Sequence, residues 1–218
     1  MCTPTLFESV DDAAPADAPV LPDAAFSGAH RLALDDRSWI EIVPGWLSGH
    51  RAWFEAVRDT TDWSQRSRRM YEQEVVEPRL TAGWTVDAAP EPSPHLAAVL
   101  GERYGVRFDR VAANHYRDGE DSVAWHGDRV RFTHAAPVVA IVSLGASRRF
   151  GLRPLGGGES RWLRLCAGDL LVMGGRCQHE WQHAVPKERG AGARISVTFR
   201  HADPGPAPRR TVPVGRRG

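Results

Sequence analysis

Short apolar segments, separated by glycine, proline and aspartate, recur along most of this chain. The last segment, residues 194–200, alternates strictly, with Ile195, Val197 and Phe199 on one face and polar residues on the other. Residues 136–144 instead form an unbroken apolar run, which is typical of a strand buried on both faces. These patterns predict a chain folded mainly into short β-strands.

The remaining strands are expected at residues 39–43, 148–153, 161–165 and 170–173. The second and third of these should pair across the glycine-rich turn between them. Many short strands with Gly and Asp turns indicate a mainly β fold of the jelly-roll kind, a double-stranded β-helix, with helices from the N-terminal third packed outside.

Residues 111–128 carry two polar pairs, Asn114-x-Tyr116 and His126-x-Asp128. Side chains two residues apart on a strand point the same way, so each pair presents its polar groups together. The sequence Arg-Asp-Gly-Glu-Asp between the pairs is typical of a turn. We therefore predict a hairpin whose polar groups face inwards.

Two helices are expected before this stretch. One should begin at Ser48, a residue type that caps helix N-termini, and bury an apolar face formed within residues 53–57. The other should begin at Ser93 and end at Gly101. Both are expected to cover a sheet.

Residues 28–201 are expected to form one domain, a size that an all-β fold commonly reaches alone. Within it, residues 63–86 predict a pair of strands or a flap, and Pro78 favours an edge position. Residues 1–27 and 202–218 have compositions that cannot bury enough surface, so we expect disorder there.

The formal charge of +1 over 218 residues selects no particular partner. The basic residues are almost all arginine, with Lys187 the single lysine. The position of each arginine is therefore better evidence for phosphate binding than the number of arginines. Three cysteines without a C-x-x-C pair favour a reducing compartment, and we expect a cytoplasmic protein. We see no secretory signal and no apolar run that would cross a membrane.

His126 and Asp128 offer an imidazole and a carboxylate on one face. A second histidine would complete the donor set that suits non-haem Fe(II). The downstream candidates are His179, His183 and His201, and His183 is favoured because the Ala-Val-Pro after it is typical of the exit from a strand. An H-x-D pair alone predicts a metal site only weakly.

Arg194 and Arg200 share the polar face of the last predicted strand. Two cations that face the interior of a barrel are costly to bury without an anion, and a dicarboxylate cosubstrate would remove that cost. Guanidinium groups match carboxylate geometry with paired hydrogen bonds. The alternative is that both arginines reach solvent or pair with acidic side chains.

In order and spacing, these motifs resemble the AlkB-type Fe(II)- and 2-oxoglutarate-dependent nucleic-acid dealkylases. The resemblance runs from about Trp39 to His201. It is most specific in Asn114-x-Tyr116, His126-x-Asp128, Trp181-x-His183 with Val185-Pro-Lys187, and Arg194-x-Ser-x-Thr-Phe-Arg200. The sequence Pro78-Arg-Leu-Thr-Ala also resembles the flap of the branch that acts on alkylated bases.

The resemblance implies an oxidoreductase that uses Fe(II), 2-oxoglutarate and O2, with DNA or RNA as partner. The metal ligands would be His126, Asp128 and His183. The cosubstrate residues would be Arg194 and Tyr116 at its distal carboxylate, Arg200 and Asn114 at its metal-chelating end, and Ser196 nearby. Such enzymes hydroxylate an N-alkyl carbon, after which an aldehyde leaves and the base is restored.

An enzyme that acts on a base must take it out of the stack and contact flanking phosphates. The resemblance places substrate contacts at Tyr71, Arg79, Trp84, Val130 and Arg153. Further arginines that could contact phosphates are Arg66, Arg68, Arg69, Arg148 and Arg149.

Two positions depart from the family pattern. Val130 stands where members that act on alkylated adenine or cytosine commonly carry an acidic residue, and Ser196 replaces a common asparagine. The first departure keeps open a 2-oxoglutarate-dependent hydroxylase of a small molecule or a protein side chain. A non-catalytic β-barrel binding module is the third interpretation, and we expect a monomer in each case.

Overall fold

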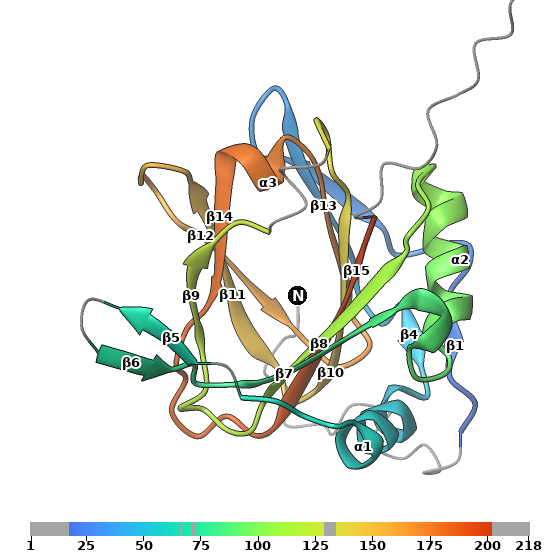
Figure 1. Cartoon of the computed structure of the whole chain (residues 1–218). Coiled ribbons are helices and arrows are strands. Elements are labelled where there is room, and N and C mark those ends of the chain that lie inside the picture. The colour runs from blue at the N-terminus through green and yellow to red at the C-terminus, as the bar shows by residue number, and fades with distance from the viewer. Residues whose placement is uncertain (1–17, 66, 71–72, 129–133, 202–218) are drawn as a thin grey trace, which may run out of the picture.

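Two antiparallel sheets face each other in the computed structural model, which describes residues 18–65, 67–70, 73–128 and 134–201 (Figure 1). The larger sheet has the order β2 (His30–Ala33), β3 (Ser38–Val43), β13 (Leu170–Gly175), β10 (Val139–Gly145), β15 (Arg194–Arg200), β8 (Arg110–Tyr116) and β7 (Leu80–Thr85). The smaller has the order β12 (Arg161–Leu165), β11 (Arg148–Pro154), β14 (Trp181–Val185) and β9 (Val123–His126). The predicted double-sheet fold is confirmed.

Two small ribbons and the helices complete the fold. β1 (Leu21–Pro22) pairs with β4 (Leu47–Ser48), and β5 (Ser67–Met70) pairs with β6 (Gln73–Val76) as a hairpin that projects beside β9 (Figure 1). The helical elements are α1 (His50–Thr60), the 3-10 turn η2 (Val86–Ala88), α2 (Ser93–Tyr104) and α3 (Cys177–Glu180). No helix of the described residues has the length and apolar character that crossing a membrane requires.

The apolar residues form two cores, one on each face of the larger sheet. The outer core joins β8, β10, β13 and β15 to α1 and α2, and includes Trp53, Leu100 and Phe199. The inner core lies between the sheets and includes Ile141 and Leu152. The strict alternation of β15 is therefore confirmed, because its apolar face packs toward the helices and its polar face lies between the sheets.

The predicted hairpin over residues 111–128 is wrong. β8 belongs to the larger sheet and β9 to the smaller, so the chain crosses between the sheets. The crossing loop is held by Arg117, whose Nε lies 2.8 Å from Asp121 Oδ2, and by the Arg148 guanidinium, which donates to the carbonyl of Asp121. These side-chain contacts replace the strand pairing that a hairpin would have provided.

Both predicted helices exist with different ends. α1 is capped by Gly49 in the left-handed conformation (φ 64°), while Ser48 belongs to β4 and donates to the carbonyl of Leu21. α2 runs past Gly101 to Tyr104 and ends at Gly105 (φ 68°). A Cβ at Gly101 would lie 2.8 Å from the Val106 carbonyl oxygen, so this glycine permits a close approach and does not end the helix.

The folded region begins earlier than the expected boundary at residue 28. Leu21 pairs with Ser48, and Phe26 is buried in the outer core against Trp46. The predicted flap contains the β5–β6 hairpin and β7, an edge strand of the larger sheet. Residues 1–17 and 202–218, together with Arg66, Tyr71 and Val130, lie outside the described residues.

Candidate metal and cosubstrate site

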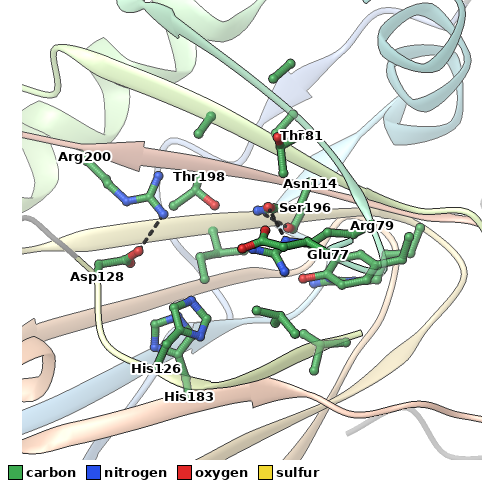
Figure 2. A pocket seen from close by; sticks show the side chains of 18 of the residues that line it. Glu77, Arg79, Thr81, Asn114, His126, Asp128, His183, Ser196, Thr198 and Arg200 are labelled. Atoms are coloured by element: carbon green, nitrogen blue, oxygen red, sulfur yellow. Dashed lines mark hydrogen bonds and ion pairs between the residues drawn. The ribbon is translucent and has the colours of Figure 1, made fainter. Parts of the chain in front are cut away.

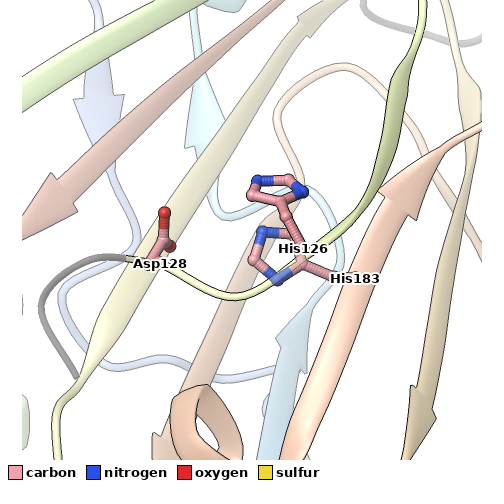
Figure 3. Close-up of side chains that lie close together, drawn as sticks. All are labelled: His126, Asp128 and His183. Atoms are coloured by element: carbon pink, nitrogen blue, oxygen red, sulfur yellow. The ribbon is translucent and has the colours of Figure 1, made fainter. Parts of the chain in front are cut away.

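His126, Asp128 and His183 lie together between the two sheets (Figure 3). His126 on β9 and His183 on β14 are register partners, and their ring centroids are 4.2 Å apart. Asp128 follows β9 by two residues, and one donor atom from each of the three side chains lies within 4.8 Å of the others. Of the three downstream histidines, the structure therefore brings the favoured one to the H-x-D pair.

Neighbouring groups fix the orientation of each side chain. His126 Nδ1 lies 2.9 Å from the Ala124 carbonyl oxygen, which leaves Nε2 for a ligand role. The Phe150 ring stacks on His183 at 5.5 Å. The backbone N–H of Asp128 donates to Gln178 Oε1 at 2.9 Å. Gln178 belongs to α3, an element that the sequence analysis missed because four residues carry too little periodicity.

The electrostatic state of the three residues fits a bound cation. Burial raises the pKa of Asp128, but Arg200 and the two histidines outweigh it and lower this pKa to about 2. Burial and the neighbouring His126 lower the pKa of His183 to about 3. At neutral pH the group therefore presents a carboxylate and a neutral imidazole, the forms that bind a divalent metal. Asp128 Oδ2 is buried without a hydrogen-bond partner, as a free ligand atom would be.

A cavity of about 810 Å³ opens beside these three residues (Figure 2). Its walls come from both sheets and from the segment before β7, and its polar lining residues include Glu77, Arg79, Thr81, Arg110, Asn114, Tyr116, Arg194, Ser196, Thr198 and Arg200. The cavity is large enough for a ligand in addition to a metal ion.

Arg194 is the buried cation of this cavity, with only 1% of its surface exposed. One Nη atom donates to Ser143 Oγ at 2.9 Å, and the guanidinium lies over the Tyr116 ring at 5.4 Å. Its Nε and other Nη atoms have no hydrogen-bond partner among the described residues. Burial lowers the pKa of Arg194, and the neighbouring Tyr116 offsets only part of this effect. A carboxylate would give this guanidinium the anionic partner that it lacks.

The other expected cosubstrate residues lie around Arg194 in the register of β8 and β15. Tyr116 is opposite Arg194, and Asn114 is opposite Ser196, with 3.5 Å between the Asn114 amide and Ser196 Oγ. Arg200 instead donates to Asp128 Oδ1 at 2.7 Å (Figure 2). From the sequence, the alternative to cosubstrate binding is that both arginines pair with acidic side chains. Arg200 does so, but Arg194 forms no ion pair in the described part of the chain.

Arg79 lines the cavity, where its Nε donates to Asn114 Oδ1 at 3.1 Å and its guanidinium lies 3.0 Å from Glu77. The sequence analysis missed Glu77. The signal for it was its place two residues before Arg79, since residues two apart in an extended segment share a face.

Two other expected substrate residues lie away from the cavity. Trp84 packs against the outer core, and Arg153 lies on the outward face of β11, where it donates to Gln182. The suggested phosphate contact at Arg148 is wrong, since this side chain is buried and donates to backbone carbonyls. Tyr71 and Val130 are outside the described residues, as are the side chains of Arg68 and Arg69.

A jelly-roll with two histidines, one carboxylate and a buried arginine in the same cavity defines a metal-dependent oxygenase that uses an acidic cosubstrate. The sequence model of the 2OG-Fe(II) oxygenase superfamily matches residues 85–200. The chain belongs to this superfamily and, within it, to the AlkB-type dioxygenases. It is therefore an enzyme that uses Fe(II), 2-oxoglutarate and O2. This membership favours catalysis over the non-catalytic binding module.

Individual relatives define the extent of the similarity. Alpha-ketoglutarate-dependent dioxygenase alkB homolog 3 of Rattus norvegicus is 34% identical over 207 residues, which cover 82% of this chain and 70% of that protein. DNA oxidative demethylase ALKBH2 of Arabidopsis thaliana is 28% identical over 202 residues, covering 72% and 64%. The structure of OsALKBH1 has a TM-score of 0.55 over 74% of this chain and 97% of that one, and at 14% identity it supports the fold alone.

Proposed function

We propose that this dioxygenase removes N-alkyl groups from the bases of DNA or RNA. The observation that carries the proposal is the similarity over most of the chain to a protein named DNA oxidative demethylase and to alkB homolog 3. The cavity supports it, because it extends from the three metal-ligand candidates to Arg79 and Glu77 and leaves room beyond the cosubstrate for a base taken out of the stack.

In this proposal His126, Asp128 and His183 hold Fe(II). The bound metal, with 2-oxoglutarate and O2, supplies the oxidation: one oxygen atom enters a C–H bond of the N-alkyl group, and the other enters succinate as CO2 leaves. The hydroxylated carbon would then lose its O–H proton and leave as an aldehyde, while the electron pair of the broken C–N bond stays on the base nitrogen, and the proton goes to that nitrogen or to solvent.

The chain's own groups position the reactants. Arg194 binds the distal carboxylate of 2-oxoglutarate with its guanidinium, while Ser143 and the Tyr116 ring hold that group in place. Arg200 holds Asp128 as an anion and so acts on the metal site directly. Asn114 and Ser196 lie between these two arginines, where they orient the cosubstrate. Apolar residues of the inner core, Ile141 and Phe150 among them, line the cavity beside the three metal-ligand candidates.

The test is to incubate the protein with Fe(II), 2-oxoglutarate and a panel of methylated DNA and RNA oligonucleotides. We expect aldehyde and succinate in equal amounts on at least one methylated oligonucleotide, and no aldehyde from the unmethylated sequence. The variant Asp128→Ala should release neither product. Release of succinate by the wild type without demethylation of any oligonucleotide would contradict the substrate and favour a small-molecule hydroxylase.

We further propose that the enzyme acts as a monomer in the cytoplasm. In the described part of the chain Cys177 is a buried free thiol, whereas Cys166 is disulfide-bonded, so the cytoplasmic location does not follow from the cysteines and is tested by fractionation of cells that express the protein. Light scattering of the purified protein gives the mass directly, and a value near 24.0 kDa is expected.

A further inference from the structure

Four side chains form a continuous stack on the outward face of the smaller sheet. The Trp125 and Trp162 rings contact each other with centroids 5.6 Å apart. The Arg149 guanidinium lies 4.3 Å from the Trp162 ring, and the Arg153 guanidinium lies 4.4 Å from the Trp125 ring. We call these four residues the Arg–Trp stack. It joins β9, β11 and β12 on the face opposite to the metal-ligand candidates.

A glycine makes the stack possible. Gly151 lies between Arg149 and Arg153 on β11, and a Cβ there would come within 2.6 Å of Trp125 Cη2 and 2.7 Å of Trp162 Cζ3. Any larger residue would push the two indoles apart. The contact between the indoles therefore depends on this one position.

The two arginines of the stack have no acidic side chain of this protein as an ion-pair partner in the described part of the chain. In the described part of the chain, neither Arg149 nor Arg153 forms an ion pair, and the side-chain acceptor bonded by Arg153 is the neutral Gln182. Trp162 is 42% exposed, among the most exposed large apolar residues of the described chain. An exposed indole covered by a guanidinium that forms no ion pair suits an anionic and aromatic partner.

Another arginine–tryptophan contact provides the comparison. Arg31 lies 3.9 Å from the Trp39 ring on the larger sheet, but its Nε also lies 2.9 Å from the buried carboxylate of Glu41. That arginine already has its anion. The stack on the smaller sheet lacks one.

We propose that the Arg–Trp stack binds single-stranded nucleic acid that flanks the target base; this rests on the proposed function. Bases stack on indole and guanidinium planes, and guanidinium donors bind phosphates. β9 is the edge strand of the smaller sheet (Figure 1). Trp125 on this strand contacts Trp162 on the outward face, while its neighbour His126 lies against His183 on the inward face. A strand that crosses this edge places one nucleotide in the cavity and the following ones on the stack. A duplex keeps its base faces covered and cannot bind in this way.

The variant Trp162→Ala tests the proposal, since this exposed side chain contributes little to the core. We expect about tenfold weaker binding of an unmethylated 12-nucleotide thymidine oligonucleotide, measured by fluorescence anisotropy, since stacking on one aromatic residue contributes that much. Arg149→Ala should weaken binding and reduce its salt dependence. Arg31→Ala, which removes the same charge from the matched contact, should bind like the wild type.

Substrate length separates this proposal from the proposed function. A methylated mononucleotide fills the cavity and has no flanking nucleotide to place on the stack, whereas a 12-nucleotide substrate has several. Trp162→Ala should therefore demethylate the mononucleotide at the wild-type rate and a 12-nucleotide substrate with about a tenfold lower kcat/KM. Equal losses on both lengths, or no loss on either, would overturn the stack proposal alone. Trp162-dependent binding without demethylation by the wild type would overturn the function and leave the stack.

Discussion

Two arginines are buried in this molecule beside the same tyrosine, but they differ in their hydrogen-bond partners. Arg148 and Arg194 are each 1% exposed, and their guanidiniums lie 5.6 Å and 5.4 Å from the centre of the same ring, that of Tyr116. Arg148 donates to three backbone carbonyls, those of Asp118, Asp121 and Pro186. Arg194 donates to one hydroxyl.

The partners of a buried arginine, and not its burial alone, indicate whether it stabilises the fold or binds a ligand. Arg148 connects the crossing loop before β9 to the segment after β14, and its Nε lies 3.9 Å from Glu188 Oε2, so its charge has both acceptors and an anion within the fold. Arg194 keeps two donors unused in the cavity, and Arg148 nearby adds repulsion to the desolvation that lowers its pKa. A cation with this environment is stable only with an anion, which makes it a binding group for a carboxylate.

The largest expected effect is the loss of stability in Arg148→Met. Three carbonyls, of which that of Asp121 belongs to a buried residue, would lose their donor at about 1 kcal/mol each, so the free energy of unfolding should fall by about 3 kcal/mol. Chemical denaturation measures this change. Arg194→Met is the matched control, and it should leave stability within about 1 kcal/mol of the wild type. Equal losses in the two variants would contradict the comparison.

Arg194→Met should instead act on the cosubstrate. Loss of the charged partner of a buried carboxylate weakens binding by about 2 to 5 kcal/mol, so kcat/KM for 2-oxoglutarate should fall at least about thirtyfold. Succinate release at varied 2-oxoglutarate concentrations gives this value. An unchanged kcat/KM would assign the cosubstrate carboxylate to another cation.

Ser143→Ala sharpens the comparison with a smaller change. It removes the one hydroxyl that orients Arg194, at a cost of about 1 kcal/mol. KM for 2-oxoglutarate should rise about fivefold, while kcat stays near the wild-type value because the metal ligands are untouched. A fall in kcat without a change in KM would show that Ser143 acts elsewhere.

The smallest expected effect is a change in the pH dependence of stability, caused by Asp121 in the crossing loop that Arg148 contacts. Burial raises the pKa of Asp121, but its bonds with Arg117 outweigh this and hold the pKa below its ordinary value of 3.8. A lowered carboxyl pKa contributes stability that is full above pH 3.8 and is lost as the pH falls through the lowered pKa. Asp121→Asn should therefore reduce the melting temperature near neutral pH and flatten its decline in acid. A decline as steep as in the wild type would assign the acid sensitivity to other carboxylates.

Local pattern predicted much of this molecule. The alternation of β15 placed Arg194 and Arg200 on one face, and the H-x-D spacing placed His126 beside Asp128, because both depend on the geometry of a single segment. The choice of His183 over His179 and His201 agrees with the geometry, since His179 bonds to the His134 carbonyl and His201 accepts from the Val138 N–H.

Contacts between residues that are distant in the chain could not be predicted from the sequence. Alternation places Arg148 on the face of Phe150 and Arg149 on the opposite face, but it does not give their partners, three backbone carbonyls for Arg148 and the Trp162 ring for Arg149. The crossing of residues 111–128 between two sheets likewise depends on partners that are distant in the chain. The roles of Gln178 and Glu77 depend on how α3 and the segment before β7 pack.

The central claim is that Arg194 binds the carboxylate of the cosubstrate beside the metal. Calorimetric titration of 2-oxoglutarate into the Fe(II)-loaded protein without oxygen tests it most directly, with Arg194→Met and Arg31→Met as a matched pair. We predict saturable, metal-dependent binding by the wild type and Arg31→Met, and at least thirtyfold weaker binding by Arg194→Met. Binding by Arg194→Met with wild-type affinity would contradict the claim.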